Sequence, residues 1–251
     1  MENIELIILG SNLHFLDINS IKKHKSNIFK ICDLKIVNNL PNPVHESGYL
    51  DQEYLDNQLR EIVGPDNDNI RICIINCSLE NNFYVRRIFD KTAVLSLWIP
   101  KRILDDYNIS IENFIIKNIY EMVTMFIESK GKLTSIDAYS IPHIDTRGCL
   151  FDMNGDITNV IHNTEKPSIC SSCKARLNTK SLPTNFIINL EKELNKINKK
   201  FFLNVELKIK KYPMLSLMLT IFLGIIINIL SNILIENCNE IFLFIKHLFR
   251  K

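Results

Sequence analysis

The sequence is poor in glycine and carries little net charge. Seven glycines in 251 residues leave little room for a glycine-rich phosphate loop or a GxSxG nucleophile elbow, and neither motif is present. The net charge of +2 provides no clustered basic excess of the kind that nucleic-acid-binding proteins show. Paired-carboxylate motifs and internal repeats are also absent. We therefore expect no nucleic-acid partner and none of the common phosphate-loop or serine-hydrolase chemistry.

An export signal and a disulfide pattern are missing as well. The N-terminus is acidic, and it lacks the basic start and the small-residue cleavage site of a secretory signal. The cysteines are odd in number and unevenly spaced, at positions 32, 73, 77, 149, 170, 173 and 238. We therefore expect reduced thiols in a domain that faces the cytosol.

One long apolar segment without charges lies near the C-terminus. Tyr212–Ile235 contains 24 uncharged residues. A helix of that length extends about 36 Å, against about 30 Å for the hydrocarbon core of a bilayer. Lysines are frequent between Lys192 and Lys211, whereas only three basic residues follow the segment in a short amphipathic tail. This asymmetry predicts a single-pass membrane protein whose N-terminal part is cytoplasmic.

Small and polar residues recur in this segment at intervals of four. On a helix, four successive members of such a row lie within about 120° of one another. Small residues let membrane helices approach closely, and an asparagine in hydrocarbon favours a polar partner on a neighbouring helix. The row consists of Ser216, Thr220, Gly224, Asn228, Asn232 and Glu236. We expect a face for homo-oligomerisation, which in a larger assembly would line a pore; the alternative is a passive anchor.

The residues before the membrane segment predict a mixed α and β domain. Short buried strands are expected at Ile4–Leu9, Ile70–Asn76 and Ala93–Trp98, and helices at Asp51–Val63, Ser110–Ser129 and Thr184–Lys200. The helix Ser110–Ser129 is apolar nearly all round, so we place it at the centre of the domain. A half-buried strand, Phe201–Ile209, then leads into the membrane segment without a flexible linker. The predicted fold class is an α+β domain with a mixed sheet, followed by one C-terminal transmembrane helix.

Cysteine and histidine residues cluster after the central helix. Cys170-Ser-Ser-Cys173 has the spacing that lets two thiolates bind one tetrahedral ion. Cys149 offers a third sulfur, and His143 or His162 a nitrogen. We expect a structural zinc ion, which would fix a loop region with little apolar material of its own. A redox pair and ordinary loop cysteines are the alternatives.

This segment resembles the C-terminal part of the archaemetzincin family of zinc peptidases. In that family a third zinc-binding histidine is followed by further cysteines and a later CxxC, which form a second zinc site. His143, Cys149, Cys170 and Cys173 match this arrangement, although Ile144 stands where the family has a cysteine. The resemblance covers about residues 1–180 and implies a zincin-like fold.

The catalytic part of the family motif is absent. The best match to its HExxH helix is Tyr120-Glu121-Met122-Val123-Thr124, which keeps the glutamate and lacks both histidines. Metal-assisted hydrolysis needs about three protein ligands and an open position for water. The resemblance therefore implies a scaffold that keeps its structural metal and has no catalytic residues.

These observations predict four segments and a non-enzymatic function. The segments are a zincin-like sensor domain at 1–180, a connector at 181–211, a transmembrane helix at 212–235 and a tail at 236–251. We expect the cytosolic, zinc-stabilised domain to sense an unknown small molecule or protein and to drive self-association of the helix. This layout is similar to that of membrane-disrupting effectors in antiviral defence. A membrane-tethered peptidase that uses Glu121 and His143, and a passive anchored interaction module, are the alternatives.

Overall fold

The computed structural model describes residues 1–251 except 12, 44–52, 145, 198–208, 210–211 and 249–251. Within these residues the chain forms two compact units, Met1–Lys199 and Lys200–Lys251. Each unit is described by itself below. Unit 1 carries the sheet, the metal-ligand candidates and most of the helices, and unit 2 carries one long helix.

A five-stranded mixed sheet with the order β2-β1-β4-β7-β6 forms the framework of unit 1. Its strands are β1 (Glu2–Leu9), β2 (Phe29–Val37), β4 (Ile70–Ile75), β6 (Val85–Phe89) and β7 (Thr92–Ser96). The first four neighbours in this order run parallel, and β6 pairs antiparallel with β7 at the edge. The short strands β3 (Glu53–Tyr54) and β5 (Ser78–Leu79) pair separately.

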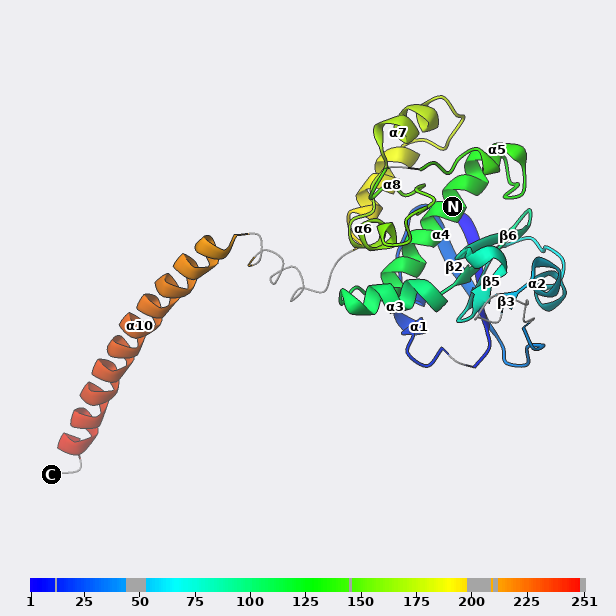
Figure 1. Ribbon diagram of the computed structural model, residues 1–251. Coiled ribbons are helices and arrows are strands. Elements are labelled where there is room, and N and C mark those ends of the chain that lie inside the picture. Colours follow the sequence, from blue (N-terminus) through cyan, green and yellow to red (C-terminus); the bar gives the residue numbers. More distant parts are fainter. Residues whose placement is uncertain (12, 44–52, 145, 198–208, 210–211, 249–251) are drawn as a thin grey trace. The chain divides into compact units, whose positions relative to one another are not determined.

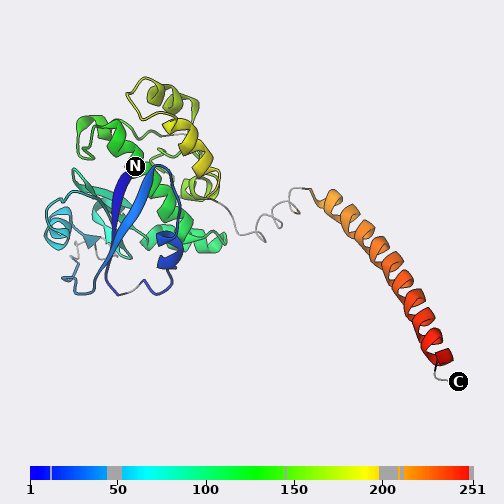
Figure 2. The same cartoon turned by 180° about the vertical axis from the view of Figure 1, so that it is seen from behind.

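Helices cover both faces of this sheet (Figures 1 and 2). They are α1 (Ile18–Lys22), α2 (Asp56–Val63), η1 (Glu80–Asn82), α3 (Trp98–Asp106), α4 (Ile111–Glu128), α5 (Ile136–Tyr139), α6 (Asn159–Glu165), α7 (Ser171–Asn178) and α8 (Phe186–Leu194). Successive residues of a strand point to opposite faces, and β1 shows the result. Its Ile4 and Leu6 join the core around α4, whereas Ile7 and Leu9 join a smaller core with Leu59 of α2.

The expected strands and the central helix are confirmed with small changes at their ends. β1 and β4 coincide with the predicted segments, and α4 is buried nearly all round. The strand predicted at Ala93–Trp98 ends at Ser96, because Trp98 already begins α3. The helix predicted from Asp51 begins only at Asp56, since Glu53 and Tyr54 pair with β5 instead.

Helix α8 belongs to unit 1, although the sequence placed it in a connector. Its Phe186, Leu190 and Leu194 are buried in the core that also contains α4. The buried carboxylate of Glu193 accepts hydrogen bonds from Ser26 Oγ at 2.6 Å and from Tyr120 Oη at 2.8 Å. Of the strand predicted at 201–209, all residues but the last lie outside the described ones.

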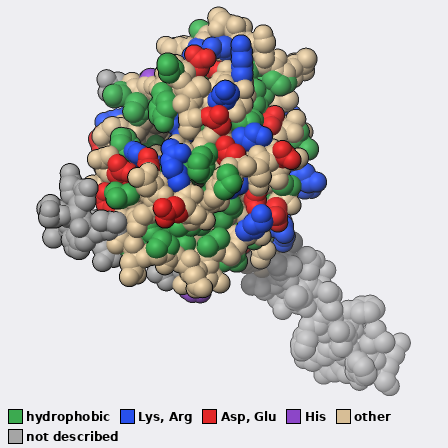
Figure 3. Space-filling view, turned by 90° about the vertical axis from the view of Figure 1, so that its right-hand side faces the viewer, with side chains coloured by type: hydrophobic (Ala, Val, Ile, Leu, Met, Phe, Trp, Pro, Cys, Tyr) green, Lys and Arg blue, Asp and Glu red, His purple; other side chains and the backbone are tan. Residues whose placement is uncertain are grey.

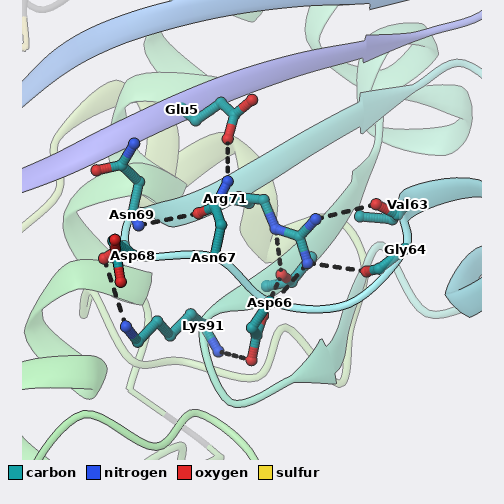
Figure 4. A network of polar contacts seen from close by, with 10 residues as sticks. Glu5, Val63, Gly64, Asp66, Asn67, Asp68, Asn69, Arg71 and Lys91 are labelled. Carbon is teal, nitrogen blue, oxygen red and sulfur yellow. Dashed lines mark hydrogen bonds and ion pairs between the residues drawn. The ribbon is translucent and has the colours of Figure 1, made fainter.

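A buried arginine fixes one end of the parallel strands (Figure 4). Arg71, near the start of β4, donates from Nε to Thr92 Oγ1 of β7 at 2.9 Å. Its other nitrogens donate to the carbonyl oxygens of Val63 and Gly64, both at 2.9 Å. Asp66 adds an ion pair at 3.3 Å. The guanidinium thus links β4, β7 and the end of α2. These four contacts are all with residues of unit 1.

Unit 2 contains helix α10, Pro213–Leu248. Its stretch Pro213–Ser231 has a mean hydropathy of 2.3, and none of it is buried within the chain. The helix is therefore long and apolar enough to cross a membrane, as the sequence predicted. Ser216 donates to the carbonyl of Pro213 at 2.8 Å, and Thr220 to that of Ser216 at 2.9 Å. The hydroxyl groups of the predicted row are therefore satisfied within their own helix.

Candidate metal centre

His143 is held in place by backbone pairing on both sides of its peptide unit. Its N–H donates to the Phe151 carbonyl at 3.0 Å, and its carbonyl accepts from Met153 N–H at 2.9 Å. This ladder forms a parallel bridge between His143 and Asp152. These hydrogen bonds fix the backbone of His143, although the residue lies on a loop, and so they limit where its imidazole ring can lie.

Cys149 is positioned by a second bridge, to the segment that precedes the CxxC motif. Leu150 N–H donates to the Ser168 carbonyl at 2.7 Å, and Ser168 N–H donates to the Gly148 carbonyl at 2.8 Å. Gly148 has a φ of +85°, which an L side chain rarely adopts, so glycine is favoured at this turn. The bridge brings Cys149 close to Cys170 in space despite their separation in sequence.

Cys170 and Cys173 occupy the first turn of α7. Cys170 is the N-cap residue, and its sulfur accepts from Cys173 N–H at 3.4 Å. One helical turn separates the two side chains, so both point to the same side. Cys173 is fully buried, whereas Cys170 and His143 are partly accessible. The site therefore lies at the boundary between the core and the surface.

The four side chains converge with the spacing of a tetrahedral metal site. Their ligand atoms all lie within 4.8 Å of one another. His143 Nε2 is 3.3 Å from Cys149 Sγ and 3.6 Å from Cys170 Sγ, and the sulfurs of Cys149 and Cys173 are 3.9 Å apart. Around a tetrahedral zinc ion, sulfurs lie about 3.8 Å from one another and about 3.6 Å from a nitrogen ligand. The donor set and its spacing thus fit zinc.

Proton sharing among the sulfurs is consistent with a site made for a cation. A hydrogen bond from the Cys173 thiol, helped by backbone N–H groups and His143, lowers the pKa of Cys149 to about 4. The same contact with Cys149 raises the pKa of Cys173. A bound metal ion would replace the thiol protons of the site.

Arg176, one turn after Cys173, supports the cluster from outside. Its Nη1 lies 3.4 Å from Cys173 Sγ, and its Nε donates to Glu128 Oε1 at 2.8 Å. The guanidinium also lies over the ring of Phe151, at 5.0 Å from its centre. Arg176 was not among the residues predicted for the site. The sequence signal for it is its position three residues after Cys173 in a helical segment, which places both side chains on the same face of the helix.

His162, the alternative fourth ligand, does not take part in the cluster. It lies on the exposed side of α6, while His143 provides the nitrogen. The cysteines that the structure describes are all free thiols, so it shows no disulfide in the CxxC motif. His143, Cys149, Cys170 and Cys173 are therefore the four residues that could bind a metal such as zinc.

The residues at the positions that correspond to HExxH make structural contacts in this fold. Glu121 is buried and pairs with Lys117 at 2.6 Å, within α4. The hydroxyl of Tyr120 donates to Glu193, and that of Thr124 donates to the Tyr120 carbonyl at 2.7 Å. In the described part of the chain, the His–Cys cluster is the group that could hold a metal ion, and it is not an HExxH motif.

No protein-family model matches the chain, and none of the curated proteins does. Among solved structures, the chain is similar to the crystal structure of archaemetzincin from Methanopyrus kandleri at 1.5 Å resolution, with 15% identity and a TM-score of 0.46. The match covers 70% of this chain and 96% of that one.

Proposed function

We propose that this chain is a non-enzymatic single-pass membrane protein. Its zinc-stabilised cytosolic domain responds to a ligand or partner, and the response drives self-association of α10. The observation that carries the proposal is the unburied apolar stretch Pro213–Ser231 on a chain whose other unit has its own complete core. In water this stretch would expose a continuous apolar surface, which soluble proteins avoid.

The metal centre supports a structural role for the ion. Three sulfurs and one nitrogen complete a tetrahedral shell, which leaves no open position for a reacting water. When bound, zinc would supply a cross-link between the His143–Cys149 loop and α7. We assign the ion the task of keeping the domain folded, and the response to a trigger comes from the domain as a whole.

Self-association is assigned to the polar row of α10. The hydroxyls of Ser216 and Thr220 already bond to their own backbone, so they add little attraction between helices. Asn228 and Asn232 carry amides that a hydrocarbon environment leaves without water, and like residues on a second helix supply partners. Gly224, between them and the helix start, permits close approach of the backbones. We assign membrane disruption to the associated form.

The test measures association and membrane integrity with the full-length chain in liposomes. Energy transfer between labelled copies reports association, and release of a trapped dye reports disruption. Each asparagine contact contributes roughly 0.6–2 kcal/mol, so Asn228→Leu/Asn232→Leu should weaken association at least about fivefold and reduce dye release. Ile227→Leu/Ile229→Leu, which leaves the row intact, is the matched control. If the two double variants associate equally, the asparagine row does not drive association, and α10 is only a passive membrane anchor.

Orientation has its own experiment. Cys32 is exposed in unit 1, and Cys238 follows the apolar stretch on the other side. In intact cells carrying the Cys238→Ser variant, a membrane-impermeant maleimide should label Cys32 only after permeabilisation. Labelling of Cys32 in intact cells would place unit 1 outside the cytoplasm.

A further inference from the structure

A cavity of about 340 Å³ opens between β6, α4 and α5 in unit 1. This volume is at the lower end of the range for small-molecule sites. Figure 3 shows the side of unit 1 that includes β6, α2 and α5, where hydrophobic side chains lie among charged ones. The metal centre lies outside this cavity, and none of its four ligands lines the wall.

Among the described residues, Arg87 is a cation on this wall that makes no ion pair within 4 Å, although the charge of Glu121 acts on it. The neighbouring Arg86 donates from Nε to Asp56 Oδ1 at 2.8 Å, and Glu121 is paired with Lys117. Arg87 itself donates from Nη1 to the Ala138 carbonyl at 2.9 Å and stacks over the Tyr139 ring at 3.9 Å. This hydrogen bond uses one of the guanidinium nitrogens, and the half-buried side chain lines the cavity.

The rest of the wall is largely apolar and adaptable. Met122 and Met125 are buried at its base, and Met153 lies at the rim with 48% of its surface exposed. Methionine side chains are flexible and polarisable, so they fit apolar groups of different shape. Tyr139, held by Arg87, forms another part of the rim.

We propose that this cavity binds a small organic acid. The carboxylate takes the unbonded N–H groups of Arg87, and the apolar part packs against Met122, Met125 and Met153. An arginine fork matches a planar carboxylate better than it matches other small groups. Arg86 on the same wall is already paired with Asp56, and Glu121 with Lys117, so Arg87 offers one positive charge to a ligand, which favours a monoanion over a phosphate dianion. The ligand is thus an acid with a single charge and an apolar body of about phenyl size.

The site also has a direct connection to the metal loop. Pro142 lines the cavity and precedes His143, and Met153 N–H donates to the His143 carbonyl. A ligand that orders this rim therefore acts on the two segments that hold the histidine. In the proposed function, unit 1 responds to a ligand, and we assign that role to this acid. Only this assignment rests on the proposed function; binding of the acid is independent of membrane disruption.

The test uses the full-length protein in lipid nanodiscs and isothermal titration with three probes. They are 3-phenylpropionate, its neutral amide and phenyl phosphate. We expect the acid to bind at least tenfold more tightly than either of the others. Arg87→Gln should weaken binding of the acid at least tenfold, and Arg87→Lys should weaken it less, because it keeps the charge and loses the fork. Arg102→Gln, on the exposed side of α3, is the matched control.

Three results would overturn the proposal. They are equal binding of the acid and the amide, unchanged binding by Arg87→Gln, and no binding of the acid to the wild-type protein at about 5 mM. Thermal melting checks that each variant is folded, since Arg87 also anchors α5 through Ala138. Titration of Asn228→Leu/Asn232→Leu separates the two proposals: it should bind the acid normally even if it no longer self-associates.

Discussion

The guanidinium of Arg176 lies between the sulfur of Cys173, at 3.4 Å from Nη1, and the carboxylate of Glu128, at 2.8 Å from Nε. Glu128 is buried in the last turn of α4. With zinc bound, three thiolates would leave one net negative charge, and the guanidinium of the Arg176–Glu128 ion pair lies beside it. The metal loop is in this way tied to the central helix of unit 1 by charge as well as by packing.

Arg176→Gln should lower zinc affinity about 10–100-fold, the usual effect of removing a residue that supports metal ligands. The loss arises because the thiolates lose a nearby cation while all four ligands remain. Competition with a chelating dye gives the affinity. Arg147→Gln is a matched control, because Arg147 is exposed and lies outside the cluster. Equal affinities of the two variants would contradict the assigned role of Arg176.

Purified protein should contain about one zinc ion per chain, and Cys149→Ser or Cys170→Ser should remove most of it. Chelation of the wild type should lower the midpoint of thermal unfolding by roughly 10 °C or more, because metal binding contributes to folding of the loop region. Elemental analysis and calorimetry measure these effects. Cys32→Ser, at an exposed thiol outside the cluster, should change neither. A second zinc ion that depends on Glu121 would instead support the peptidase alternative.

Local patterns were enough to predict β1, β4, β7, the central helix and the three cysteines of the cluster, but they missed β2 and the edge strand β6. β1 and β4 are short apolar runs between turn residues, and such runs make buried strands in a parallel sheet. The CxxC spacing required no knowledge of the fold, because one helical turn brings both sulfurs together. The choice of His143 over His162 did require knowledge of the fold. The bridges His143–Asp152 and Cys149–Ser168 decide which imidazole ring reaches the sulfurs.

Long-range partnerships could not be predicted. The apolar face of α8 indicates that the helix packs on something, but its spacing does not say on which unit. Glu193 meets Tyr120 across 73 positions, and Arg71 meets Thr92 across 21. Each of these residues is common on exposed surfaces, so nothing local distinguishes it. The cavity beside Arg87 likewise depends on how β6, α4 and α5 pack.

Arg71→Met should destabilise unit 1 by about 3–5 kcal/mol, the usual cost of breaking a buried charged network from one side. The substitution removes the side-chain donor to the carbonyls of Val63 and Gly64 and the ion-pair partner of Asp66, which keeps hydrogen bonds from Thr92 and from the Lys91 N–H. Urea unfolding measures the loss. Lys91→Met is the control, because the Lys91 ammonium is exposed and contacts only the Asp68 carbonyl at 3.4 Å, so about 0.5 kcal/mol or less is expected. Similar losses in both variants would show that Arg71 is not a special anchor.

Acid should destabilise unit 1 in two steps, through His24 and Glu193. Burial lowers the pKa of His24 below its ordinary 6.5, and its Nε2 lies 2.8 Å from Tyr120 Oη. Burial alone would raise the pKa of Glu193, but hydrogen bonds from Ser26, Asn27 and Tyr120 outweigh it and lower that pKa below 4.5. In both cases the unfolded chain binds more protons than the folded one, so stability falls as pH falls. His24 acts from about pH 6.5 downward, and Glu193 from about pH 4.5 downward.

Urea unfolding between pH 7.5 and 4 tests these two steps separately. His24→Gln should flatten the loss of stability between about pH 6.5 and 5, relative to the wild type, because the group that must stay neutral is gone. Glu193→Gln should flatten the loss below about pH 4.5, at the cost of lower stability at neutral pH. His14→Gln, at an exposed histidine, should keep the wild-type slope. Any release of zinc in acid affects all three proteins alike, so the differences between them isolate the network. A His24→Gln profile parallel to the wild type would show that the contact with Tyr120 does not control the acid response.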